Sequence, residues 1–226
     1  MTLTANNLTR AAGVAAVLSG LLYITVQFIH PAESVASVTT TEWAVVAWMT
    51  VAIGVLGLIG VTGMYLRQVR EIGLFGLIGF LLLGVFFLTT AAFSFVEALV
   101  LPAIVGKSPK VVEDILGIFS GAPADGSLGA LEGLSTFAFA IYLLGGLVFG
   151  IALFRARVLS RWAGLLLAAG AVSTLLVPLL PHQVARFAAV PVGIALVWLG
   201  YSLWADGRRP ATTTRQAAQL DSAAAE

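Results

Sequence analysis

The sequence predicts an all-α integral membrane protein, a bundle of six transmembrane helices. Apolar residues make up 59% of the chain and charged residues only 10%, whereas a soluble domain carries about 25% charged residues. Six stretches approach or exceed the roughly 20 apolar residues that cross about 30 Å of hydrocarbon as a helix. These stretches lack the period-two alternation of membrane β-barrel strands. A water-soluble enzyme is therefore excluded.

Each expected span is a long apolar run bounded by polar or charged residues. In chain order the spans are Ala11–His30, Trp43–Leu66, Ile72–Val100, Leu128–Phe154, Trp162–Leu180 and Phe187–Trp204. A cleaved signal peptide is the alternative for the first. Its apolar stretch of about 19 residues is longer than that of a signal peptide, and Pro31-Ala32-Glu33 is a poor cleavage site. The first span is therefore expected to stay in the protein.

The basic residues predict that both termini are cytoplasmic. With this orientation nine arginines fall on the inside: Arg10, Arg67, Arg70, Arg155, Arg157, Arg161, Arg208, Arg209 and Arg215. Three basic residues fall outside: Lys107, Lys110 and Arg186. Nine against three satisfies the positive-inside rule.

The net charge and the cysteine content exclude further classes of function. The net charge of +1 gives no excess of positive charge for binding nucleic acid. The absence of cysteine excludes disulfides and thiolate metal sites.

A weak repeat predicts that the six helices form three helical hairpins. An arginine precedes a glycine by three residues at the start of each odd-numbered span, as Arg10, Arg70 and Arg161 show. Either duplication or positive-inside selection alone explains this repeat. Glycines also recur at three-residue steps through the second and third spans. Small residues let helix backbones approach closely in lipid, so these glycines are predicted to line packing seams.

Two segments lie outside the spans of the transmembrane domain, which covers residues 1–206. Residues 108–120 open with Ser-Pro and form an amphipathic pattern, which predicts a helix on the outer surface. We expect Val111, Ile115 and Phe119 to turn inward, so that the helix covers the outer mouth of the bundle; docking into the bilayer interface is the alternative. Residues 207–226 have no apolar period, which predicts a disordered cytoplasmic tail.

A polar layer is predicted in the outer half of the bundle. It contains both histidines of the chain and the two carboxylates that fall within span limits: His30, Glu97, Glu132 and His182. Ionisable groups inside a membrane protein are costly, so they indicate functional sites. We expect the four residues to lie at similar depth, with Glu97 near a histidine or Glu132.

This layer admits three chemical interpretations. Two histidines and two glutamates are able to bind a divalent metal or to transfer protons. Their spacing matches no known metal motif, so the sequence assigns no metal site and no cofactor. The structural alternative is that His30 and His182, each beside a proline, end helices at the water interface, and that Glu97 and Glu132 reach headgroups or a helix start.

Two segments are similar to a known family. They are Arg10-Ala11-Ala12-Gly13 with Gly20-Leu21-Leu22-Tyr23, and the run from Leu153 to Gly164, Leu-Phe-Arg-Ala-Arg-Val-Leu-Ser-Arg-Trp-Ala-Gly. The chain resembles, over about residues 8–205, the bacterial six-helix membrane proteins of domain-of-unknown-function family 4386, in the style of its actinobacterial members. The resemblance implies the fold and the membrane location, and no site residue follows from it.

Function is predicted from the polar layer and the aromatic residues around it. The leading hypothesis is a membrane protein that binds a small apolar ligand in an outward-facing polar and aromatic cavity. Its expected ligand-binding residues are Tyr23, Gln27, His30, Trp48, Ser94 and His182. The alternative is a membrane-embedded acid–base enzyme, an isoprenoid cyclase or isomerase, with Glu97 as proton donor and Glu132 as the second catalytic carboxyl. A third possibility is a structural subunit that binds a partner. The lipid bilayer is the one partner that the composition predicts.

Overall fold

The computed structural model of the chain describes residues 4–120, 126–179 and 186–208. Over these residues the protein is helical and contains no strand. His182, the residues after Arg208 and the tail predicted there lie outside the described residues. The longer helices are α1 (Ala5–Ile29), α2 (Thr41–Arg67), α3 (Val69–Phe95), α5 (Pro109–Ser120), α6 (Leu134–Ala156), α7 (Arg161–Ser173) and α9 (Val190–Asp206).

Short helical turns extend or connect these helices. After α3 the chain continues through a π-helical turn, η2 (Val96–Val100), into α4 (Leu101–Ile104). The 3-10 turns are η1 (Ser37–Thr39), η3 (Gly129–Gly133), η4 (Thr174–Leu179) and η5 (Arg186–Ala189). Threonine hydroxyls cap the first two long helices, because Thr4 accepts from the Asn7 amide and Thr40 from the Trp43 amide.

Within the described residues, five apolar helical stretches are long enough to cross a membrane, which indicates a membrane protein. They are Ala5–Ile29, Thr41–Arg67, Val69–Ile104, Gly129–Ala156 and Arg186–Asp206. The predicted fifth span is shorter as an apolar helix, from Arg161 to Leu176. Its last part belongs to the 3-10 turn η4, which contains Pro178. Proline has no N–H to donate, so the α-helical bonding pattern cannot run through it.

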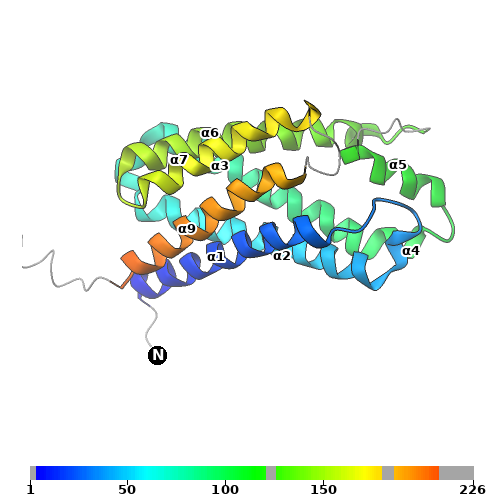
Figure 1. Cartoon of the computed structure of the whole chain (residues 1–226), viewed down its shortest axis with the longest axis horizontal. Coiled ribbons are helices and arrows are strands. Elements are labelled where there is room, and N and C mark those ends of the chain that lie inside the picture. Colours follow the sequence, from blue (N-terminus) through cyan, green and yellow to red (C-terminus); the bar gives the residue numbers. More distant parts are fainter. Residues whose placement is uncertain (1–3, 121–125, 180–185, 209–226) are drawn as a thin grey trace, which may run out of the picture.

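The six long apolar helices pack as a closed ring. Going round the ring, the order is α1, α2, α3, α6, α7 and α9, and α9 returns to α1. Figure 1 shows α1, α2 and α9 on one side of the bundle and α6 and α7 on the other. The main buried core lies within this ring and includes Phe87, Phe149, Met64 and Leu199. Helices that are adjacent in sequence are therefore also adjacent in space, and the ring is closed by two helices from opposite parts of the chain.

Glycines lie where neighbouring backbones in the ring come closest. Between α1 and α9, a Cβ built on Gly13 would lie 2.7 Å from the carbonyl oxygen of Gly200, and a Cβ on Gly200 would lie 2.7 Å from that of Gly13. Between α6 and α7, a Cβ on Gly150 would lie 2.6 Å from the carbonyl oxygen of Gly164. Such separations exclude any side chain, so these glycines form the packing seams that small residues provide in membrane bundles.

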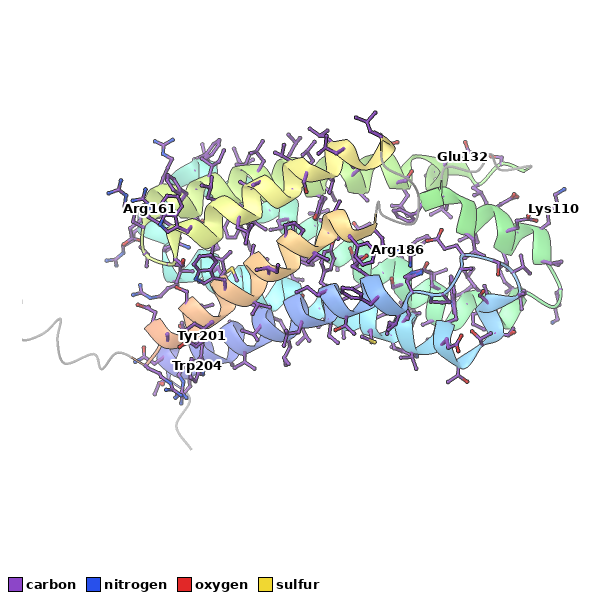
Figure 2. The ribbon with its side chains drawn as sticks, in the orientation of Figure 1. Lys110, Glu132, Arg161, Arg186, Tyr201 and Trp204 are labelled. Carbon is purple, nitrogen blue, oxygen red and sulfur yellow. The ribbon has the colours of Figure 1, made fainter. Side chains whose placement is uncertain are left out.

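The two ends of the bundle differ in charge. One end, here named the arginine end, carries Arg10, Arg67, Arg70, Arg155, Arg157, Arg161 and Arg208 at the helix termini. Figure 2 shows Arg161, Tyr201 and Trp204 at this end and Lys110, Glu132 and Arg186 towards the other. Arg67 of α2 forms an ion pair with Asp206 of α9 at the arginine end. The opposite end, here named the α5 end, contains α4, α5 and the connections that flank them.

Helix α5 packs on the α5 end, and of the three side chains expected to turn inward only Ile115 is buried. Its buried side chains are Val112, Ile115, Leu116 and Ile118, which form a second apolar cluster with Val38, Trp43 and Leu101. The expectation that Val111 and Phe119 turn inward was wrong, because they are 44% and 48% exposed. The apolar side chains share one broad side of this helix, and the position of its partners selects which of them are buried.

Candidate functional site

A small cavity at the α5 end brings two of the predicted polar residues together. It is lined by His30, Trp43, Val46, Ala47, Thr50 and Glu97, and its volume is about 10 Å³. His30 ends α1, Glu97 lies in the π-helical turn that follows α3, and the other four residues belong to α2. His30 and Glu97 thus line one cavity, with α2 forming the wall that both residues share.

The π-helical turn is explained by Pro102, which follows Glu97 by five residues. Pro102 has no backbone N–H, so it cannot donate the usual helical hydrogen bond to the carbonyl four residues before Pro102. The Leu101 amide instead donates to the Val96 carbonyl, five residues back. The Glu97 carbonyl accepts from the Trp43 indole nitrogen at 3.0 Å. A tryptophan from α2 thus satisfies a backbone group in the widened turn, and such π-turns often occur at functional sites.

The Glu97 carboxyl group is held from its own helix. Ser94 is buried, with 3% of its surface exposed, and its hydroxyl donates to Glu97 Oε2 at 3.0 Å. The three-residue separation places both side chains on one helix face. Ser94 therefore fixes one carboxyl oxygen at the wall of the cavity and leaves the other available for a second hydrogen bond.

His30 is oriented by the backbone just after α1. Its Nδ1 lies 2.8 Å from the carbonyl oxygen of Pro31, and a carbonyl only accepts, so Nδ1 carries the hydrogen. In the neutral ring Nε2 is then the acceptor. The ring also lies edge-on to Trp43, with 6.4 Å between ring centroids. Trp43 therefore contacts both polar residues of the cavity, since it packs on the His30 ring and its indole N–H donates to the Glu97 carbonyl.

The other predicted site residues lie apart from this cavity. Gln27 donates from its side chain to the Tyr23 carbonyl of the same helix. Tyr23 packs against the main core. It lies near the buried hydroxyl of Tyr142, which has no hydrogen-bond partner among the described residues. Glu132 is exposed and accepts from the Leu128 amide at 3.0 Å, which caps the turn before α6. His182 is outside the described residues.

Trp48 belongs to a second hollow on the opposite face of α2. This open apolar groove has a volume of about 440 Å³ and is lined by Leu22, Thr41, Ala44, Val45, Trp48, Met49 and Ala52. Six of the seven residues follow helical spacing along α2, and Leu22 comes from α1. The indole of Trp48 also meets Phe95 edge-on, with 6.3 Å between centroids. The predicted polar and aromatic cavity is thus divided by α2 into a polar cavity and an apolar groove.

Sequence reasoning missed Trp43 and Thr50 as site residues. These two residues repeat with Val46 and Ala47 at helical spacing on one face of α2. That pattern, with a polar residue at each end, is a usable signal. Pro102 five residues after Glu97 is a second one, because it indicates where the helix must widen.

The size of the polar cavity limits its chemistry. A cavity needs about 10–15 Å³ to hold one water molecule, so this one is at the lower limit for a single water. His30 and Glu97 are an acid–base pair around that volume, and Thr50 and Trp43 complete the wall. Among the residues that the structure describes, no group of three or more histidine or acidic side chains is placed to bind a metal.

Comparison of the chain with protein-family models, curated proteins and solved structures gives no match. The resemblance to domain-of-unknown-function family 4386, carried by residues 10–23 and 153–164, therefore stays a prediction.

Proposed function

We propose that the chain is a six-span protein of the bacterial cell membrane, arranged as three helical hairpins with both termini cytoplasmic. The support is the separation of charge along the bundle, since seven arginines lie at the arginine end. The positive-inside rule assigns such an end to the cytoplasm. In this arrangement α7 and η4 form the fifth span, and α5 lies on the outer surface.

Cysteine labelling tests this topology, because the chain contains no cysteine of its own. The variants are Lys107→Cys at the α5 end and Arg70→Cys at the arginine end, both at exposed positions. A membrane-impermeant maleimide applied to intact spheroplasts is expected to label the first variant at once and the second only after permeabilisation. Labelling in the reverse order would show that the termini are outside.

We further propose that the protein binds a small apolar molecule in the groove between α1 and α2. The observation that carries this proposal is the groove itself, because about 440 Å³ falls within the range of roughly 300–1,000 Å³ that is usual for ligand pockets. Its lining is apolar apart from Thr41, which suits an isoprenoid or acyl chain. The polar cavity, by contrast, holds no more than a water molecule.

An acid–base enzyme acting on such a molecule is the second candidate. The observation that favours it is the shared cavity of His30 and Glu97, which faces the opposite side of α2 from the groove. Glu97 would protonate the substrate, Nε2 of His30 would remove a proton from the resulting cation, and transfer of that proton from His30 to the Glu97 carboxylate would restore both groups. An organic substrate reaches this pair only if the cavity opens, since its volume is about 10 Å³.

Mass spectrometry of apolar molecules that co-purify with the protein tests both candidates. Wild type is expected to retain a defined molecule, and Ala44→Phe, which fills the groove, is expected to lose at least about 90% of it. Ala169→Phe is the control, because Ala169 is exposed on α7 and lies outside the groove. Equal retention by the two variants would overturn the groove proposal. An enzyme is indicated if wild type holds two isomers and Glu97→Gln holds one.

A further inference from the structure

The connection between α6 and α7 concentrates positive charge at the arginine end. Arg155, Arg157 and Arg161 lie within seven residues, and we name them the arginine turn. From Gly133 to Ala205 the sequence has no acidic residue. Within the part of the chain that the structure describes, none of the three arginines forms an ion pair. Glu71 on α3 and Asp206 on α9 also lie at the arginine end, and Asp206 is paired with Arg67.

Arg161 is held in place by aromatic rings rather than by a carboxylate. Its guanidinium carbon lies 4.6 Å from the ring centroid of Phe154 and 5.0 Å from that of Trp162. Its Nε is buried and has no hydrogen-bond partner. Trp162 is 57% exposed, as is typical of an aromatic residue at the level of lipid headgroups. The cation is thus fixed at the membrane surface with unused hydrogen-bonding capacity.

Arg157 has a backbone conformation that an arginine seldom adopts. It is the C-cap of α6, with φ of 57° and ψ of 20°. Glycine is the usual residue in this left-handed position, because other residues have a steric penalty there. In the described part of the chain Arg157 is the one non-glycine residue with positive φ. The strain points to a use for its exposed, charged side chain.

We propose that the arginine turn binds the phosphate of an anionic phospholipid. The proposal rests on the embedding of the bundle in a membrane and is independent of the apolar groove. Arginine forms paired hydrogen bonds with phosphate oxygens, and basic residues at the cytoplasmic ends of helices recognise anionic lipid headgroups. Arg155 and Arg157 are exposed and supply charge, while Arg161 supplies a fixed donor beside an indole that packs at the same level.

The test measures binding of short-chain phosphatidylglycerol to the detergent-solubilised protein by titration calorimetry, with short-chain phosphatidylcholine as the uncharged reference. Wild type is expected to prefer phosphatidylglycerol at least about tenfold. Arg155→Gln with Arg157→Gln should weaken that affinity by roughly 30-fold, since each arginine that contacts the bound phosphate contributes about one factor of five. The matched control is Arg70→Gln with Arg208→Gln, which removes the same charge from exposed positions at the same end and should change the affinity less than about threefold.

A second variant separates binding from folding. Arg157→Gly removes the charge and also relieves the strained backbone, so it is expected to raise the melting temperature while weakening phosphatidylglycerol binding about fivefold. Equal losses in the two double variants would mean that only net charge matters, and would overturn the proposal. Inorganic phosphate that binds as tightly as the lipid would overturn it as well, and so would binding that Arg157→Gly leaves unchanged.

Discussion

Replacement of Gly79 by alanine is expected to lower the free energy of unfolding by about 3 kcal/mol. Gly79 is a contact point of α3 with α6, and a Cβ there would lie 2.7 Å from Cα of Phe149 and closer still to its amide nitrogen. Both atoms belong to the backbone, so no side-chain rotation relieves the overlap. The two helices must move apart, and the packing along their whole seam is weakened.

Gly84 provides the control for Gly79 on the same helix. A Cβ on Gly84 would meet only Leu58 Cδ1, at 3.4 Å, and that methyl group is able to move. Alanine also has a higher helix propensity than glycine by about 1 kcal/mol, so Gly84→Ala should be neutral or stabilising. Reversible unfolding in mixed micelles of detergent and SDS measures both variants. Similar destabilisation by the two would contradict the closeness of α3 and α6 as the cause.

Replacement of Trp43 by alanine is expected to be the most damaging change at the α5 end. Trp43 is 3% exposed, contacts His30 and donates to the Glu97 carbonyl. It also belongs to the apolar cluster that holds α5. The loss should be about 3 kcal/mol, and amide hydrogen exchange in α5 should accelerate by roughly 100-fold. Hydrogen–deuterium exchange with mass spectrometry resolves this segment.

Two further tryptophan variants, Trp48→Ala and Trp43→Phe, show which contacts of Trp43 stabilise α5. Trp48→Ala removes the same kind of side chain from the same helix, but Trp48 is 46% exposed on the groove side, so exchange in α5 should stay as in wild type. Trp43→Phe keeps most of the ring and leaves the Glu97 carbonyl unsatisfied, which costs about 1–3 kcal/mol. If Trp43→Ala and Trp48→Ala accelerate exchange equally, Trp43 does not anchor α5.

The helices and part of the site could be predicted from the sequence because both depend on local chemistry. Apolar length and arginine placement fix where helices begin and end relative to a bilayer. The shared cavity of His30 and Glu97 agrees with their predicted depth, because each lies near the α5 end of its helix.

Features set by tertiary contacts could not be predicted in the same way. The apolar side of helix α5 is broad, and only the positions of Trp43 and Leu101 decide that Val112 rather than Val111 is buried. The division of the expected cavity into two also depends on α2 lying between His30 and Trp48. Depth along a helix axis places residues in a layer, but rotation about the axis decides which of them meet.

The pairing of α1 with α9 has a consequence for biosynthesis. The glycines of α1 at the seam, Gly13 and Gly20, meet Gly200 and Gly193, so the partner surface of an early helix is translated more than 160 residues later. Until then α1 presents a small-residue face that α9 of another copy is able to occupy. Ribosome pausing before Val190 should therefore prolong the lifetime of an open five-helix intermediate and favour exchange of α9 between chains.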